Sequence, residues 1–289
     1  MIEQDVLRRF LFEELGVRGT WVKLTGSWLA AKQHQLGPDN AQLQLGQALA
    51  VVVMLSSTIK FSGSMILQAQ GDGDIKTLVA QSTHDKKIRG LIRCNDQVPE
   101  GSLESRFGQG RLVLTIEPDN GQPYQGVVPL QGQNLAAALQ TYFEQSEQLN
   151  TRLWLFADAN CAAGLLIQEL PAQKHDDADW ERIEILADTV TEREVLELDC
   201  EDLLYKLFNE EQVRLFDAEP VAFQCACSRP KIETTLRALG REELEGILQE
   251  RGDIEVACDF CGAHYLFDKV DVETLLSEES RVQPSETKH

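Results

Sequence analysis

Residues 40–58 read NAQLQLGQALAVVVMLSST, and this stretch decides the fold class together with the segments around it. Asn40 is a residue type that caps helix N-termini, and the residues after it are largely apolar. A helix that is apolar on nearly all sides is buried on most of its faces. The stretch therefore predicts a buried core helix that begins with Asn40 as its cap.

Outward from this helix the sequence period changes from helix to strand. Two pairs of strand-like runs each flank a turn rich in Gly, Asp and Asn, which is typical of β-hairpins. The paired runs are MILQAQ (65–70) with IKTLVAQ (75–81), and RLVLTIE (111–117) with YQGVVPL (124–130). Further strands are expected at 88–94 and from residue 151, with a helix after Asn134. Residues 1–171 are thus predicted to form an N-terminal α+β domain with an antiparallel-rich sheet.

Composition limits the class of protein and its compartment. The chain has 289 residues, 43% of them apolar, which is enough for a sizeable core. It has no run of about 18 apolar residues, and MIEQDVLRRFLFEELG (1–16) lacks the basic and apolar regions of a signal peptide. We therefore expect a cytoplasmic protein without a membrane partner. In that compartment seven cysteines are expected to be thiols and metal ligands rather than a disulfide framework.

The negative charge is concentrated in one part of the chain. The formal net charge is −20, and residues 171–220 alone carry 16 acidic against 5 basic side chains. Phosphate backbones repel such a chain, which argues against nucleic acid as a partner.

Residues 172–220 are predicted to be an acidic, helical linker. Thr191 and Glu194 have the spacing of a capping box. A single helix with one apolar stripe is expected after them, and the stripe consists of Leu196, Cys200, Leu203, Leu204, Leu207 and Phe208. An ordinary surface helix would dock this stripe on the main domain. The acidic opposite face adds repulsion, so the docking is expected to be less secure than usual.

Four cysteines in residues 221–270 have the spacing of zinc ligands. Cys225 and Cys227 form a CxC pair, and Cys258 and Cys261 form a CxxC pair 30 residues later. Four thiolates complete a closed tetrahedral site, so one Zn²⁺ per chain is expected and His264 is not needed as a ligand. This small domain has few large apolar residues, so the metal must supply much of its folding energy, about 10–16 kcal/mol in small zinc domains. Residues 271–289 are expected to be a polar, disordered tail.

The cysteine spacing alone leaves more than one interpretation open. A permanent structural zinc site fits it as well as a site that opens on oxidation, since residues two and three apart can also form local disulfides. Thiol–disulfide catalysis at the CxxC is a third interpretation, but the motif does not begin a helix after a strand. Cys94, Cys161 and Cys200 are interpreted as buried, inert thiols. The sequence shows no nucleotide-binding motif and no set of catalytic residues, so an enzyme is not expected.

The chain resembles the redox-regulated heat-shock chaperones known as the 33 kDa chaperonin family. The resemblance runs nearly end to end and is strongest at the segments FQCACSR (223–229), ACDFCGAHYLFD (257–268), LLYKLFNEEQVRLFD (203–217), YFEQSEQL (142–149) and GLLIQELP (164–171). It implies an α+β domain, a metastable helical linker and a C-terminal zinc domain that keeps the reduced protein inactive.

The resemblance also implies a mechanism of activation. By position, Cys225, Cys227, Cys258 and Cys261 would bind zinc, and oxidation would form the disulfides Cys225–Cys227 and Cys258–Cys261 and release the metal. The unfolded linker would then offer its apolar face to unfolding client proteins, the oxidised chain would form a homodimer, and an ATP-dependent foldase would later receive the clients. We assign the client-binding face to Leu196, Leu203, Leu204, Leu207 and Phe208. A zinc-ribbon binding module and a thiol–disulfide oxidoreductase are the alternatives.

Overall fold

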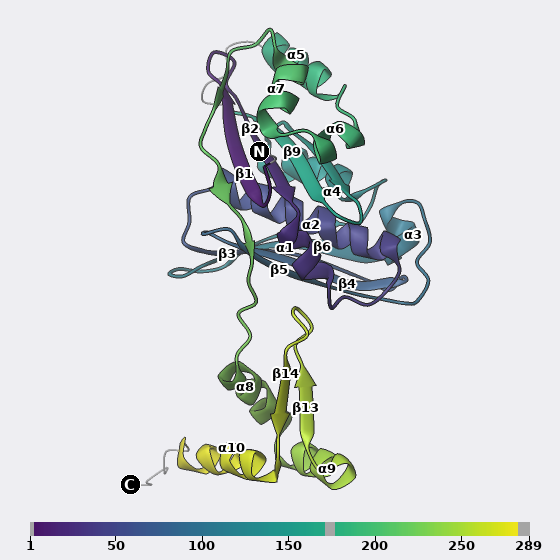
Figure 1. Ribbon diagram of the computed structural model, residues 1–289, viewed down its shortest axis with the longest axis vertical. Coiled ribbons are helices and arrows are strands. Elements are labelled where there is room, and N and C mark those ends of the chain that lie inside the picture. Colours follow the sequence, from purple (N-terminus) through teal and green to yellow (C-terminus); the bar gives the residue numbers. More distant parts are fainter. Residues whose placement is uncertain (1–2, 171–176, 283–289) are drawn as a thin grey trace. The chain divides into compact units, whose positions relative to one another are not determined.

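The chain divides into two compact units, residues 1–224 and residues 225–289. The structure is a computed structural model that describes residues 3–170 and 177–282. Helices and mostly antiparallel sheets make up the larger unit, and a two-stranded sheet with helices makes up the smaller one (Figure 1). The predicted α+β fold class is therefore confirmed. The boundaries predicted at residues 171 and 220 stay predictions.

One sheet of the larger unit is entirely antiparallel. Its strands are β1 (Val6–Phe12), β2 (Val17–Leu24), β8 (Thr151–Ala157), β9 (Ala162–Glu169), β10 (Val213–Leu215) and β11 (Glu219–Pro220). Their order is β10-β1-β2-β9-β8, and β11 pairs with β1. Every residue of β9 is buried, which is expected of a strand that is covered on both faces of its sheet.

The second sheet contains the predicted hairpins. Its strands are β3 (Gly63–Gly71), β4 (Ile75–Thr83), β5 (Lys87–Cys94), β6 (Gly110–Pro118), β7 (Tyr124–Pro129) and β12 (Ala222–Phe223). Their order is β12-β5-β4-β3-β6-β7, and only the β12–β5 pairing is parallel among the described strands. The hairpins β3–β4 and β6–β7 and the strand β5 were predicted from the sequence and are confirmed.

Helix α2 (Asp39–Thr58) forms the core of the larger unit and contacts strands of both sheets. Its length and composition would allow it to cross a membrane, but 72% of the tested window is buried inside the domain, as in a core helix. The prediction of a buried helix is confirmed, but Asn40 is not its cap. Pro38 precedes the helix, and the Asn40 side-chain amide donates to the Val98 carbonyl at 2.7 Å. Smaller elements complete this unit: α1 (Gly26–Lys32), α3 (Leu103–Phe107), α4 (Leu135–Tyr142) and the π-helical turn η1 (Phe143–Glu147).

Three helices from the predicted linker cover the face of the first sheet that α2 does not touch: α5 (Asp177–Ala187), α6 (Glu192–Glu197) and α7 (Cys200–Phe208) (Figure 1). The predicted capping box of Thr191 and Glu194 is confirmed. The prediction of a single helix after this box is wrong. The backbone is extended at Leu198 and Asp199, so two helices, α6 and α7, form instead.

The break between α6 and α7 is held by two side chains of the main domain. Lys23 donates through Nζ to the carbonyl oxygens of Glu197 and Leu198, at 3.1 and 3.2 Å. Glu3 accepts through Oε2 from the backbone N–H of Cys200 at 3.0 Å. These partners satisfy backbone groups that a continuous helix would have paired internally. The break therefore depends on tertiary contacts that the sequence pattern does not reveal.

The smaller unit consists of α8 (Arg229–Leu239), α9 (Arg241–Arg251), the hairpin β13 (Ile254–Ala257) and β14 (His264–Phe267), and α10 (Lys269–Val282). Helices α8 and α9 lie between the two cysteine pairs. Residues 269–282 are helical, so the disordered tail predicted at 271–289 is wrong up to residue 282, and residues 283–289 lie outside the described part of the chain.

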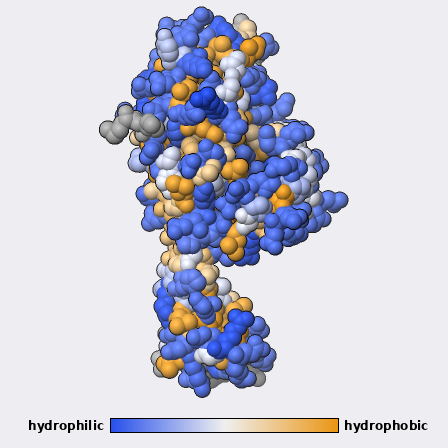
Figure 2. Space-filling view, turned by 45° about the vertical axis from the view of Figure 1, so that its right-hand side comes forward, coloured by the Kyte–Doolittle hydropathy of each residue, from blue (hydrophilic) through white to orange (hydrophobic). Residues whose placement is uncertain are grey.

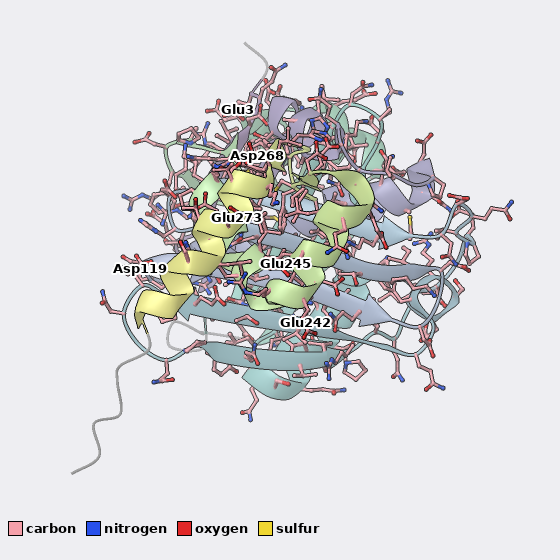
Figure 3. All side chains as sticks on the ribbon, turned by 90° about the horizontal axis from the view of Figure 1, so that it is seen from below. Glu3, Asp119, Glu242, Glu245, Asp268 and Glu273 are labelled. Atoms are coloured by element: carbon pink, nitrogen blue, oxygen red, sulfur yellow. The ribbon has the colours of Figure 1, made fainter. Side chains whose placement is uncertain are left out.

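The apolar spacing within α10 explains this error. Val272, Leu275 and Leu276 recur at three- and four-residue intervals and are buried in the core of the smaller unit. The outer faces of α9 and α10 are polar. The exposed residues there include Glu242 and Glu245 of α9 and Glu273 of α10 (Figure 3). The acidic composition of the segment concealed one short apolar stripe.

Candidate metal centre

Two segments of the smaller unit bring the four predicted ligands together. Cys225 and Cys227 lie in the extended segment before α8, and Cys258 and Cys261 lie in the turn of the β13–β14 hairpin. This turn is closed by backbone hydrogen bonds from the Gly262 N–H to the Cys258 carbonyl at 2.8 Å and from the Cys258 N–H to the Ala263 carbonyl at 2.9 Å. Gly262 has φ +67°, a left-handed conformation that suits glycine. The tight turn directs both thiols of the CxxC pair toward the CxC segment.

The geometry of the four sulfurs fits one tetrahedral ion. All four Sγ atoms lie within 4.8 Å of one another. The Cys225 and Cys258 sulfurs are 3.7 Å apart, and the Cys227 and Cys261 sulfurs are 3.4 Å apart. Zn–S bonds of about 2.3 Å in a tetrahedron place neighbouring sulfurs about 3.8 Å apart. A set of four thiols at this separation is suited to zinc, so the donor chemistry and the spacing agree.

His264 lies outside this cluster. Its Nδ1 is 2.7 Å from Oε1 of Glu255, and 66% of its side chain is exposed. The imidazole therefore has a partner on the neighbouring strand, and the metal cluster among the described residues consists of cysteines alone.

Tyr265 is a functional neighbour that the sequence did not indicate. Its hydroxyl donates to the Cys227 sulfur at 3.2 Å and, with help from the other thiols, lowers the pKa of Cys227 to about 7. The same hydrogen bond raises the pKa of Tyr265 to about 12. Burial raises the pKa of Cys225 and Cys261. Only the register of the β13–β14 hairpin brings Tyr265 to this sulfur, and the sequence contains no motif for the contact.

The rest of the smaller unit is fastened around Arg229, which begins α8. Its guanidinium donates to the Leu266 carbonyl at 2.9 Å, pairs with Asp271 at 2.7 Å and lies 4.3 Å from the centre of the Phe267 ring. The core beneath contains seven buried apolar side chains among the described residues: Leu236, Leu244, Ile254, Phe267, Val272, Leu275 and Leu276. Five partly buried apolar side chains pack against this core: Ile232, Ile247, Leu248, Val256 and Tyr265.

Comparison with known proteins places this geometry in a family. The family model described as Hsp33 protein matches residues 5–268. The 33 kDa chaperonin of Nitrosococcus oceani is 56% identical over 289 residues, with both chains fully covered. That of Methylobacillus flagellatus is 42% identical, with 99% of each chain covered.

The chain belongs to the Hsp33 family. A crystal structure of the 33 kDa chaperonin of Thermotoga maritima has the same fold, with a TM-score of 0.82 at 24% identity, and the match covers 96% of this chain and 99% of that one. The resemblance inferred from the cysteine motifs and their surroundings is thereby confirmed. The family is one of chaperones, and this member has the cysteine cluster intact.

In this Hsp33 family member the linker stripe is docked rather than exposed. The side chains of Leu203, Leu204, Leu207 and Phe208 are buried against the first sheet, and Leu196 is half-buried beside them. Phe208 meets the ring of Phe12 edge to face, with ring centres 4.9 Å apart. The five residues assigned to client binding thus share one packed surface, which includes their neighbour Cys200.

The three other cysteines of this Hsp33 family member lie away from the metal cluster. Cys161 and Cys200 are buried, and burial raises the pKa of both thiols, that of Cys161 to about 11. Cys94 is only half-buried, contrary to expectation, because it is the last residue of β5. Burial still raises the pKa of the Cys94 thiol. Thiols that stay protonated are poor nucleophiles and poor metal ligands.

Proposed function

We propose that the chain is a redox-regulated holdase of the cytoplasm that is inactive while its four cysteines hold Zn²⁺ and active once they are oxidised. Cys225, Cys227, Cys258 and Cys261 would hold the ion, whose charge would stabilise four clustered thiolates. Oxidation would form the disulfides Cys225–Cys227 and Cys258–Cys261. The smaller unit and the linker would unfold, and the exposed apolar surface would bind unfolding proteins. The oxidised chain would act as a homodimer, without catalysis, and pass its clients to an ATP-dependent foldase.

The small core of the smaller unit carries this proposal. Seven buried apolar side chains among the described residues give a unit of this size little stability of its own, so the cysteine cluster must organise it. Local disulfides would join cysteines only two and three positions apart and would restrict the chain far less than a cross-link between the two segments. Oxidation would therefore remove the organising contacts without replacing them.

The redox step is balanced with a peroxide as the oxidant. Each pair of thiolates loses two electrons as its S–S bond forms, and each hydrogen peroxide accepts two electrons and two protons to give two water molecules. Two equivalents of peroxide thus oxidise one chain. The four sulfurs then no longer act as thiolate ligands, so the metal has no site.

The linker can be released because its docking is imperfect. The indole N–H of Trp21 is buried at this interface without a hydrogen-bond partner among the described residues. A buried polar group without a partner costs about 1–3 kcal/mol, which undocking would recover through hydration. The net charge of −11 in residues 171–220 would also favour an extended linker.

The face of the chain in Figure 2 suits an inactive state. Most of the face in Figure 2 is hydrophilic, and hydrophobic residues form only small, scattered patches. A holdase needs a contiguous apolar surface for its clients. The surface formed by Leu196, Leu203, Leu204, Leu207 and Phe208 is such a surface, and it becomes accessible only when the linker undocks.

The test of this function measures metal release and client aggregation together. The reduced, zinc-loaded chain is treated with peroxide, zinc is followed with a chromogenic chelator, and light scattering reports aggregation of an unfolding client. Oxidant should release one zinc per chain and suppress scattering, and mass mapping should find both local disulfides. A Cys94→Ser variant should behave as the parent does. Equal suppression in the reduced and oxidised chains would refute the switch.

A second experiment tests whether docking of the linker keeps the reduced chain inactive. Leu203→Ser with Phe208→Ser removes two buried anchors, so the reduced variant should already suppress scattering and show faster hydrogen exchange in α6 and α7. Tyr205→Ser is the matched control, since Tyr205 lies on the same helix and 74% of it is exposed. A doubly substituted variant that stays inactive, with a protected linker, would exclude the docking role.

A further inference from the structure

We infer that the larger unit also carries a binding site for a small phosphate-bearing anion. The site is a polar pocket of about 490 Å³ between the C-terminal end of α2 and the turn from β4 to β5. Pockets of about 300–1,000 Å³ are the usual size of small-ligand sites. Its lining includes Arg9, Lys60, His84, Lys86 and Glu219.

The charge of the pocket contrasts with that of the chain. Three basic side chains, those of Arg9, Lys60 and Lys86, line it against one carboxylate, that of Glu219, whereas the whole chain has a net charge of −20. Asp85 is adjacent in sequence, but it is exposed and accepts a hydrogen bond from the Thr83 hydroxyl. A net charge of +2, with His84 neutral, matches a phosphate group, which carries about −1.5 to −2 at pH 7.

Lys86 is the feature that an ordinary surface patch lacks. Only 7% of it is exposed, and its backbone has φ +60°, a conformation that non-glycine residues rarely adopt. Its Nζ donates to the His84 carbonyl at 3.2 Å and makes no ion pair within the described residues. An ammonium has three donors, so two remain for a ligand. A lysine side chain is rarely this deeply buried.

Glu219 shows that the pocket already accommodates an anion. Its Oε1 lies 2.7 Å from Nε of Arg9. Glu219 belongs to the short strand β11, which pairs with β1, so the chain itself places a carboxylate among these cations. An external phosphate would compete with this carboxylate for Arg9 and would gain Lys60 and Lys86 as well.

The alternative role for these cations is to stabilise the C-terminal end of α2, where the helix dipole is negative. That role predicts a contribution to stability and no saturable anion binding. The two roles are therefore separated by a titration with a phosphate probe.

The experiment titrates the full-length reduced chain with inorganic phosphate and with glycerol 3-phosphate at constant ionic strength, followed by amide chemical shifts and calorimetry. We expect one saturable site with shifts at Gly63 and Lys86. Lys60→Gln, which removes an exposed cation, should weaken binding about tenfold. Glu219→Gln should strengthen binding several-fold, because the competing charge is removed.

Two control variants make the same charge changes elsewhere in the larger unit. Lys76→Gln removes an exposed lysine of β4, and Glu13→Gln removes an acid that pairs with Arg214 at 3.2 Å. Both should bind the probes as the parent does. The site is supported if either probe binds saturably and if Lys60→Gln weakens this binding while Lys76→Gln does not. An absence of saturation, or equal weakening by Lys76→Gln, overturns it.

Discussion

The two units of this chain are stabilised in different ways. In the larger unit, α2 has sheet strands on several sides. Of its ten residues from Gln44 to Val53, all except Gln47 are buried. In the smaller unit the buried apolar side chains among the described residues number seven, spread over three helices and a hairpin. One unit has a continuous hydrophobic core, and the other has a small core and four sulfurs that converge within 4.8 Å.

This difference indicates how one chemical signal can act on part of a protein. Burial of hydrocarbon is insensitive to peroxide, whereas thiolates are oxidised and lose their metal. Under the proposed function, a core of the first kind would persist under oxidative stress while a unit of the second kind would unfold. The linker helices α5–α7 belong to the larger unit by their packing, so their release requires that their own docking be weak.

Removal of the metal should have the largest effect and should be confined to one unit. A chelator, or Cys258→Ser, removes binding energy of about 10–16 kcal/mol, more than a small core can replace. Amide protection across residues 229–267 should be lost, while α2 and β9 remain protected in hydrogen exchange. Cys161→Ser, which changes a buried thiol of the larger unit, should leave the smaller unit folded. A protected β13–β14 hairpin in the metal-free chain would contradict the comparison.

Core substitutions in the two units should differ in their effect on zinc affinity. Phe267 is fully buried in the smaller unit, so Phe267→Ala should cost about 3–5 kcal/mol and lower the apparent zinc affinity a hundredfold or more, since folding and binding are coupled. Leu49→Ala in α2 should cost about 2–5 kcal/mol and leave zinc affinity unchanged. Competition with a chelator of known affinity measures both. Equal zinc affinities for the two variants would show that the smaller unit folds without help from its metal.

Local patterns in the sequence were sufficient to predict several elements. Turn residues between alternating runs gave the hairpins β3–β4 and β6–β7, and the cysteine spacing predicted the cluster that the structure assembles. Strands β1, β2 and β9 were not predicted, although they form the centre of the first sheet. β9 is buried on both faces, so it has no alternation, and a short apolar run does not distinguish strand from helix.

Long-range contacts could not be predicted from local patterns. Lys23 breaks the linker helix from a position 174 residues away, and Tyr265 reaches Cys227 only through the register of β13 and β14. The error at α10 has the opposite origin, since an acidic composition outweighed Val272, Leu275 and Leu276 in the interpretation. Pairings of this kind depend on tertiary structure, which composition and spacing do not specify.

The buried Lys23 offers a smaller and more specific change to the linker. Only 3% of Lys23 is exposed, and Lys23→Met keeps its length but leaves the carbonyls of Glu197 and Leu198 without their donor. We expect the docked linker to lose about 1–3 kcal/mol of stability. Hydrogen exchange in α6 and α7 should become faster, and zinc affinity should not change. Lys76→Met, at an exposed position, serves as the control. Linker exchange equal to that of the parent would mean that Lys23 does not hold the break.

The smallest expected effect is a dependence of the linker on pH through Glu194. Its carboxylate accepts from Lys206 and from the Thr191 backbone, and these hydrogen bonds lower its pKa from 4.5 to about 2. Because the folded pKa lies below the unfolded one, the contribution to stability is complete above pH 4.5 and is lost as the pH falls toward 2. Glu194→Gln should therefore destabilise α6 at pH 6 and make little difference near pH 2.

Hydrogen exchange in α6 at a series of pH values measures this contribution. Glu192→Gln is the matched control, because Glu192 lies in the same first turn but outside the capping box. Other carboxylates titrate over the same range in every variant, so the informative quantity is the difference between Glu194→Gln and the parent. A difference that stays constant from pH 6 to pH 2 would mean that α6 is held by its packing on the sheet and that the cap contributes no charge-dependent stability.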